Sequence, residues 1–297
     1  MATEAEILAR VKAGAAVPAR DIGELRGWIE KNSRAINAQP PEIGAIHDDV
    51  ELRPGLSADI AVPKGGGPFP VAIYLHGGGW VAGSSKSHRK LGMQFAEAGY
   101  LTINLNYRLA PEHPFPAGLD DCVFAGKWAT ENAARWGGDP SRMAIGGDSA
   151  GGNLAAATIV ALDEERSPLK FRAALLIYGL YDVPAVLERE RNKHAMGLEL
   201  MARAYVPGDY PAGLGHPRVS PLRAIRPGVM PPAFVLCGAD DPLLPESRAI
   251  AAALERAGTP HELHVIDDMP HGFVQVWMLS AAGDALGRMF SFMRRHV

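Results

Sequence analysis

The sequence predicts an α/β domain with a mostly parallel central sheet of about eight strands that helices cover on both faces. From about residue 70 onward, short apolar runs typical of buried strands alternate with longer runs of helical period. The chain has 297 residues, of which 47% are hydrophobic and 21% charged, which suffices for one large core. A strand-like run, a glycine-rich turn and a helix-like run follow one another at residues 142–160.

The N-terminal part is expected to lie outside this alternation. Residues 4–37 carry two apolar stripes at helical spacing, separated by Pro18, and the region ends near residue 40. Strand-like runs at 45–52 and 56–62 follow, and they are expected to pair as a hairpin.

The remaining elements follow in order from the apolar runs and from the turn signals between them. Strands are expected at residues 71–75, 101–107, 142–145, 173–178, 233–237 and 261–266. Helices are expected at residues 87–98, 117–136, 154–160, 246–257 and 274–295. The stretch Gly137-Gly138-Asp139-Pro140 is interpreted as a helix stop.

One insertion interrupts the alternation, because over fifty residues separate the strand ending at Tyr178 from the strand starting at Ala233. It contains a helix-like run at 186–205 and a Pro- and Gly-rich tail. A connection this long is usually a subdomain or functional. We therefore predict a core made of residues 41–180 and 219–297. A helical cap over the carboxyl ends of the strands is predicted from residues 1–40 and from the insertion 181–218.

The turn at residues 147–151 reads Gly147-Asp148-Ser149-Ala150-Gly151, a Gly-x-Ser-x-Gly motif between a strand and a helix. A serine at the tip of so sharp a turn needs small residues two positions away on either side. The helix that starts there directs its free N–H groups toward negative charge. A dinucleotide-binding loop needs a different glycine spacing. The motif predicts that Ser149 is a nucleophile, against the alternative of a glycine-rich turn with an incidental serine.

The loop His76-Gly77-Gly78-Gly79-Trp80 directly follows the strand at 71–75. Three glycines at a strand end allow backbone N–H groups to turn toward a ligand, as an oxyanion hole requires. The N–H of Ala150, next to the nucleophile, is the natural partner of this loop. His76 is expected to anchor the loop and not to act as a base.

A serine nucleophile needs a base and an acid that orients it. His271, after the strand 261–266, is preferred as the base over five other histidines by its place in the chain: His113, His194, His216, His261 and His264. Asp240 and Asp241 both follow the strand 233–237, and spacing alone does not separate them.

Six stretches together resemble the hormone-sensitive-lipase family of α/β-hydrolases, in its bacterial esterase branch. They are residues 76–80, 107–117, 147–153, 219–222, 241–243 and 271–273, and they run in the family order. The resemblance implies the α/β-hydrolase fold with a helical cap. It selects Asp241, which stands directly before Pro242-Leu243, as the acid. It also implies oxyanion donors at Gly78, Gly79 and Ala150.

The activity that the resemblance implies is a serine carboxylesterase that acts on small-molecule esters through an acyl-enzyme. Short-to-medium acyl esters are expected because the cap candidates carry many charges, as at residues 188–193, and suit a closed pocket better than a lipid surface. We expect Trp80 at the mouth of the substrate pocket, with Asp148, Tyr181 and Phe273 as further pocket candidates. An amidase, formamidase, lactonase or carbamate hydrolase would use the same triad. A non-enzymatic receptor, as in the plant gibberellin receptors, would be expected to lack the base that His271 supplies.

Composition and charge limit the classes of partner and cofactor that are expected. The net charge is −3 without a long basic run, so nucleic acid is not expected. No apolar stretch reaches about 18 residues and no secretory signal is recognised, so no membrane association is expected. Cys122 and Cys237 are interpreted as buried free thiols, which suits the cytoplasm. No metal or organic cofactor is expected, since no metal-ligand spacing occurs. A homodimer through Met289, Phe290, Phe292 and Met293 is considered.

Overall fold

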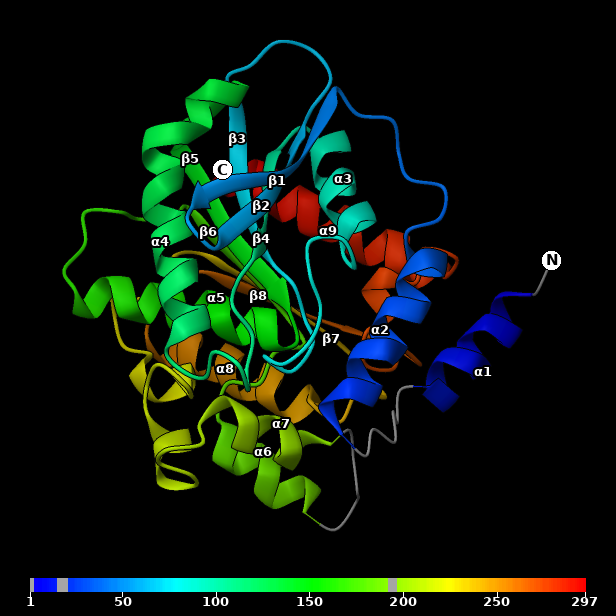
Figure 1. Ribbon diagram of the computed structural model, residues 1–297, viewed down its shortest axis with the longest axis vertical. Coiled ribbons are helices and arrows are strands. Elements are labelled where there is room, and N and C mark those ends of the chain that lie inside the picture. The colour runs from blue at the N-terminus through cyan, green and yellow to red at the C-terminus, as the bar shows by residue number, and fades with distance from the viewer. Residues whose placement is uncertain (1–2, 15–20, 192–196) are drawn as a thin grey trace.

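The computed structural model describes residues 3–14, 21–191 and 197–297, and its centre is one eight-stranded sheet (Figure 1). The strands are β1 (Ala45–Arg53), β2 (Leu56–Val62), β3 (Phe69–Leu75), β4 (Leu101–Asn106), β5 (Gly138–Asp148), β6 (Ala173–Ile177), β7 (Ala233–Gly238) and β8 (His261–Ile266). Their order is β1-β2-β4-β3-β5-β6-β7-β8. The hairpin β1–β2 and the pair β2–β4 are antiparallel, and all other pairs are parallel. The predicted α/β class with a mostly parallel sheet is confirmed.

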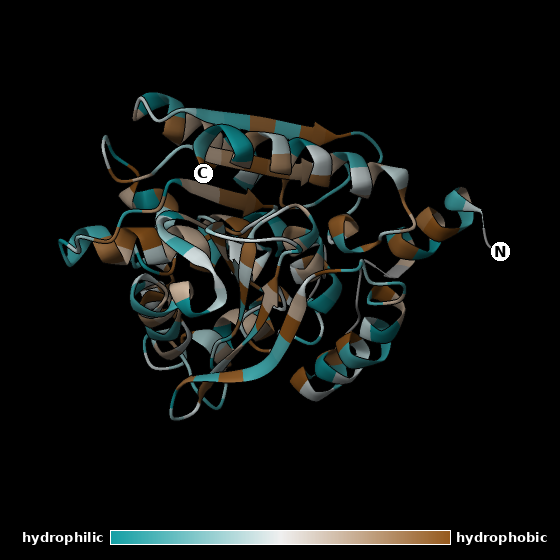
Figure 2. Cartoon of the chain, turned by 90° about the horizontal axis from the view of Figure 1, so that it is seen from above, coloured by the Kyte–Doolittle hydropathy of each residue, from teal (hydrophilic) through white to brown (hydrophobic). Residues whose placement is uncertain are grey.

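Helices cover both faces of the sheet. Figure 2 shows the apolar strands lying between these helices. They are α1 (Glu4–Gly14), α2 (Ile22–Ile36), α3 (Arg89–Glu97), α4 (Ala117–Asn132), α5 (Ala150–Glu164), α6 (Val183–Glu190), α7 (Leu198–Tyr205), α8 (Leu244–Arg256) and α9 (Ser280–His296). Side chains of α4, α5 and α8 share one core cluster, and those of α3 and α9 share the other. None of the helices described is long and apolar enough to cross a membrane.

Strand β3 shows why the parallel strands are apolar on both sides. Ile73 points into the cluster under α4 and α5, whereas the next residue, Tyr74, points into the cluster under α3 and α9. Successive side chains of a strand alternate between faces, so a strand covered twice must be apolar throughout. Such continuous apolar runs are the signal from which these strands were predicted.

The predicted start of β5 is wrong, because the strand begins at Gly138 and not at residue 142. Gly138 pairs with Phe69 and Asp139 with Pro70. An irregularity in register then separates these pairs from Val71 and Met143, where regular pairing resumes. Proline has no backbone N–H, and it is tolerated at such irregularities because the strand makes no ladder hydrogen bond at that position. Gly137 ends the preceding 3-10 turn Ala133–Trp136 in a left-handed conformation, as a helix stop does, whereas Gly138, Asp139 and Pro140 belong to the strand.

Two predicted helices are also divided. The run 186–205 forms α6 and α7 as separate helices, and residues 192–196 lie outside the described part of the chain. The predicted helix 274–295 begins instead as a 3-10 turn at Phe273–Gln275, and α9 starts at Ser280. The apolar residues considered for a dimer surface belong to the interior. Met289, Phe292 and Met293 are buried, and Phe290 packs edge-on against Phe95. Helix α9 therefore lends no support to a homodimer.

A buried amide on α5 connects the sheet layer to the insertion after β6. The Nδ2 group of Asn153 donates to the carbonyl oxygens of Leu180, at 2.6 Å, and Val219, at 2.8 Å. Its Oδ1 accepts a hydrogen bond from the indole of Trp80 at 3.3 Å. One side chain of α5 thus holds the two ends of the insertion against the core. The insertion carries α6 and α7, which lie below α5 in Figure 1.

Replacing Asn153 by Ala is expected to lower the free energy of unfolding by roughly 2–4 kcal/mol, because two buried carbonyls lose their donor. Urea unfolding checks the value. Thr158→Val on the same helix is the matched control, since the Leu154 carbonyl that its hydroxyl contacts lies within the helix ladder. Equal losses in the two variants would contradict a special role for Asn153.

Candidate active site

The turn between β5 and α5 holds Ser149 in a strained backbone conformation. Its φ is 54° and its ψ −119°, a region that side-chain-bearing residues rarely adopt. The turn is possible because its flanking residues lack side chains. A Cβ on Gly147 or on Gly151 would overlap the backbone carbonyl of Leu75 at the end of β3. The structure therefore shows the expected sharp elbow, with Ser149 at its tip and α5 starting at Ala150.

Ser149, His271 and Asp241 form a continuous hydrogen-bonded chain. His271 Nε2 lies 3.0 Å from Ser149 Oγ, and His271 Nδ1 lies 2.8 Å from Asp241 Oδ2. The other oxygen of Asp241 accepts the backbone N–H of Leu243 at 2.8 Å. Because an ionised carboxylate only accepts, Nδ1 carries the proton and Nε2 is free to accept from the serine hydroxyl.

The two neighbouring aspartates face different surroundings. The Asp241 side chain is fully buried. The Asp240 side chain is 47% exposed and pairs with Lys12 Nζ of α1 at 2.6 Å. Spacing alone left both residues as candidates for the acid. The structure brings Asp241 to His271, which agrees with the choice implied by the family resemblance.

The charge of Asp241 adjusts the basicity of His271. Burial alone would lower the pKa of this imidazole, but the charge of Asp241 and the hydrogen bond to it raise the pKa above its ordinary value of 6.5. The ring also packs edge-on against Tyr178, with 4.8 Å between ring centroids. His271 therefore becomes protonated at a higher pH than an ordinary histidine as the pH falls.

The glycine loop after β3 turns its backbone toward Ser149 in conformations that only glycine adopts easily. Gly78 has a φ of 125° and Gly79 a φ of 61°. Among the described residues, no acceptor contacts the N–H groups of Gly78, Gly79 or Ala150. Free donors of this kind are what an oxyanion hole requires. Helix α7 closes over the loop, since a Cβ on Gly79 would overlap the sulfur of Met201.

His76 anchors this loop, as expected. Its ring stacks on Tyr107, with 4.2 Å between centroids, and its Nδ1 lies 2.8 Å from the carbonyl oxygen of Gly77. Complete burial, together with the nearby His88, lowers the pKa of His76 to about 3. The ring is therefore neutral at physiological pH and donates from Nδ1 to its own loop.

The sequence suggested Asp148 as a residue of the substrate pocket. In the structure its carboxylate is instead engaged by other groups of the protein. Its buried carboxylate accepts hydrogen bonds from the Tyr74 hydroxyl at 2.9 Å, the Gly77 N–H at 3.1 Å and the Gln275 amide at 2.8 Å. Burial disfavours its charge, but His88 and these hydrogen bonds lower the pKa of Asp148 to about 2. Both oxygens are thus engaged with protein groups.

The other pocket candidates also lie in the interior. Trp80 is 2% exposed and stacks on Tyr205 of α7 at 4.7 Å, which corrects its expected place at the pocket mouth. Tyr181 and Phe273 are completely buried, one in each core cluster. Trp80 is buried because Tyr205 of α7, a helix of the insertion, stacks on it.

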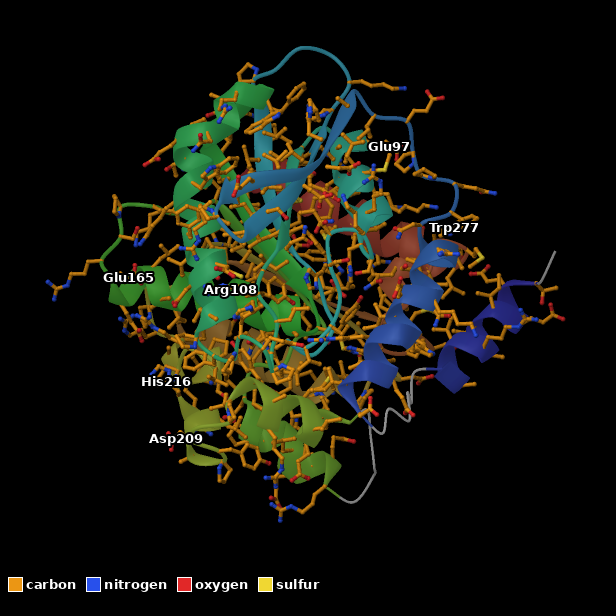
Figure 3. All side chains as sticks on the ribbon, in the orientation of Figure 1. Glu97, Arg108, Glu165, Asp209, His216 and Trp277 are labelled. Carbon is orange, nitrogen blue, oxygen red and sulfur yellow. The ribbon has the colours of Figure 1, made fainter. Side chains whose placement is uncertain are left out.

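The other histidines that were considered as the base and that are described next belong to other parts of the chain. His261 and His264 belong to β8, and His264 pairs with Glu262. His216 lies on the insertion against Phe115, on the outer side of the molecule in Figure 3. His194 lies outside the described residues. The sequence reasoning missed two groups close to the site, His88 and Gln275, because no motif spacing marks them.

In residues 3–14, 21–191 and 197–297, no group of three or more His, Cys, Asp or Glu side chains is placed so that it could hold a metal ion.

Comparisons with known proteins agree with this arrangement. A family model described as the alpha/beta hydrolase fold matches residues 72–275. Carboxylesterase NlhH of Mycobacterium tuberculosis is 37% identical over 76% of this chain and 74% of its own. Ethyl acetate hydrolase of Pseudomonas putida is 32% identical over 96% of this chain and 94% of its own. A solved esterase from the bacterial hormone-sensitive lipase family is 31% identical, covers 100% of this chain and 99% of its own, and superposes with a TM-score of 0.83. The chain therefore belongs to the alpha/beta hydrolase fold family, in its bacterial hormone-sensitive-lipase branch.

Proposed function

We propose that this chain hydrolyses carboxylic esters of small molecules through an acyl-enzyme on Ser149, with His271 as base and Asp241 as the orienting acid. The observation that carries the proposal is the continuous chain of hydrogen bonds from Ser149 Oγ to His271 and on to Asp241, at 3.0 Å and 2.8 Å. The relatives reported above are named as carboxylic ester hydrolases, and they support the ester as the bond that is cleaved.

Each group has one task in the proposed reaction. As Ser149 Oγ attacks the ester carbonyl carbon, its proton moves to His271 Nε2. The imidazolium that forms is stabilised by Asp241, and it then protonates the leaving alcohol. Water attacks the acyl-enzyme next and gives its proton to the same nitrogen. Release of the carboxylic acid restores Ser149 with its hydrogen.

The proposed oxyanion donors are the N–H groups of Gly78, Gly79 and Ala150. Their backbones are fixed by the strand β3, the elbow and the start of α5, so little reorganisation is needed when charge develops on the carbonyl oxygen. Preorganised donors of this kind are worth about 3–4 kcal/mol each in acyl transfer.

We also propose that the cap, made of the N-terminal helices and the insertion 181–218, limits the size of the acyl group. Trp80 lies under α7, and the sulfur of Met201, a residue of that helix, covers Gly79. Helix α6 is fixed to the core, because Arg189 pairs with the buried Glu246 at 2.6 Å. A relative named for ethyl acetate, a very small ester, supports a short acyl chain here.

We also propose that the protein is cytoplasmic and that it forms a homodimer. Cys122 and Cys237 are both free and buried, the state that a reducing cytoplasm maintains. A homodimer is also proposed, although its surface would have to lie elsewhere than on the buried residues of α9.

Ser149→Ala is expected to fold normally and to lose most of the esterase activity, because the covalent route is gone. An organophosphate should label wild-type protein at Ser149 alone, which peptide mass spectrometry would detect. Labelling of another serine, or an Ala variant with nearly the wild-type rate, would refute the assignment of the nucleophile.

Asp241→Asn is expected to lower kcat on the order of 10⁴-fold, as for other triad acids, whereas the neighbouring Asp240→Asn should change kcat little. In the wild type, kcat/KM should fall with decreasing pH through the raised pKa of His271, because only the neutral imidazole accepts the serine proton. Asp241→Asn lacks the charge that raises this pKa, so its residual activity should fall at a lower pH than the activity of the wild type. A larger loss in Asp240→Asn would move the role to that residue.

The rate on nitrophenyl esters is expected to rise over the first few acyl carbons and to fall well before fatty-acid length, without activation above the solubility limit. Each methylene gains about 0.8 kcal/mol only while apolar surface remains to receive it. Met201→Ala should move the optimum toward longer chains, because it removes the side chain over Gly79. Leu198→Ala, another buried position on α7, is the control. Highest activity on long-chain emulsions would instead indicate a lipase.

A further inference from the structure

The buried carboxylate of Asp148 contacts the loops that carry all three parts of the proposed site. It belongs to the elbow itself, directly before Ser149. Its Oδ1 accepts from the N–H of Gly77, at the start of the oxyanion loop, at 3.1 Å. Its Oδ2 accepts from the amide of Gln275, four residues after His271, at 2.8 Å. The reaction as described above uses neither the Asp148 carboxylate nor the Gln275 amide.

The amide of Gln275 makes a second contact, with His88. Gln275 Nε2 lies 2.7 Å from His88 Nε2 as well as 2.8 Å from Asp148. Only the NH₂ end of the amide can donate to a carboxylate, so this end faces Asp148. On the other side of the ring, His88 Nδ1 lies 2.8 Å from Ser87 Oγ, which donates to the Ser84 carbonyl.

His88 Nε2 also lies 3.2 Å from Asp148 Oδ1, so the carboxylate faces both the amide and the imidazole. Gln275 contacts Asp148 and His88 together. These contacts place the Gln275 amide between the carboxylate of the elbow and the ring of His88.

A displacement of Gln275 would be transmitted to the base. Gln275 ends the 3-10 turn that starts at Phe273, and its own N–H donates to the carbonyl of Gly272 at 3.2 Å. Gly272 follows His271 directly. On the outer side, Trp277 donates to the Ala35 carbonyl of α2 at 3.3 Å in an exposed contact beside that helix (Figure 3). The buried contacts of Gln275 are therefore the stronger restraint on this loop.

We propose that Gln275 is a positioning residue, which fixes the loop of His271 to the elbow and the oxyanion loop through Asp148 and His88. The proposal rests on the roles of Ser149 and His271 proposed above. Gln275 does not touch the reacting atoms. It sets the distance from His271 Nε2 to Ser149 Oγ and the place of the Gly78 and Gly79 donors together, because one carboxylate holds both loops.

Two substitutions at this position separate positioning from packing. Gln275→Leu keeps the volume and removes both hydrogen bonds of the amide. Gln275→Glu keeps the shape but places a carboxyl group against Asp148. The titratable groups around this position are Asp148 on β5, His88 before α3, Tyr74 on β3, and the loop residues His76 and His271. Protonation of one carboxyl group of this pair restores an attractive contact, whereas loss of that proton leaves two facing carboxylates that repel.

Gln275→Leu is expected to lower kcat by about ten- to a hundredfold with KM nearly unchanged, because a small misplacement of a base costs that much in rate. The ratio of kcat in Gln275→Glu to kcat in Gln275→Leu should fall at least about tenfold from about pH 6 to about pH 9. The ratio cancels the titration of His271 that both variants share. Steady-state kinetics with a soluble short-chain nitrophenyl ester measures both quantities.

Asn132→Asp is the matched control, an amide-to-acid change at a half-buried residue whose amide caps the end of α4 far from the site. Its kcat should follow the wild-type pH profile. Urea unfolding of all variants shows whether any lost activity reflects unfolded protein. A Gln275→Leu variant with wild-type kcat, or a Glu-to-Leu ratio that does not change with pH in folded protein, would overturn the proposal. If Ser149→Ala keeps activity, the proposed function fails instead, whatever Gln275 does.

Discussion

The close approach of the elbow to the end of β3 is the constraint on which the rest of the site depends. Gly147 and Gly151 lie so near the carbonyl of Leu75 that neither could carry a side chain. The parallel pairing of β3 with β5 brings these segments together, and Leu75 pairs with Gly147. The nucleophile and the loop that follows Leu75 are therefore placed side by side by the sheet itself. The base and acid join them because β7 and β8 end at the same edge.

The sequence predicted the parts of this structure that obey a simple period or a known motif. Continuous apolar runs identified the strands. Chain order predicted that Ser149 and His271 meet, and the family resemblance selected Asp241 over Asp240 as their partner. What could not be predicted depends on contacts between distant segments. The start of β5 at Gly138 follows from its register with Phe69, and the burial of Trp80 follows from α7 lying over it. Single polar side chains such as Gln275 carry no sequence signal, because only the fold decides what they face.

Buried polar groups hold the insertion to the core beside the apolar contacts that it makes with the main cluster. Asn153 bonds to both of its ends, and Glu246 accepts the N–H groups of Tyr181 and Asp182 while pairing with Arg189. Buried groups of this kind are costly when left without partners, so they favour one arrangement strongly over others. Over the oxyanion loop the contact is different, because Met201 is an unbranched and adaptable side chain. The attachment of the insertion is thus specific at its ends, and its contact over the substrate side is deformable.

The backbone of Ser149 links catalytic ability to a cost in stability. A residue with a side chain at a φ of 54° and ψ of −119° stores on the order of 1–3 kcal/mol, most of which glycine would not incur. Glycine gives back roughly 0.5–1 kcal/mol through the greater freedom of its unfolded chain. Mutation at this one position can therefore yield a protein that is both inert and more robust. Directed evolution for heat tolerance alone would favour such a loss, so any selection on this scaffold must reward turnover in the same round.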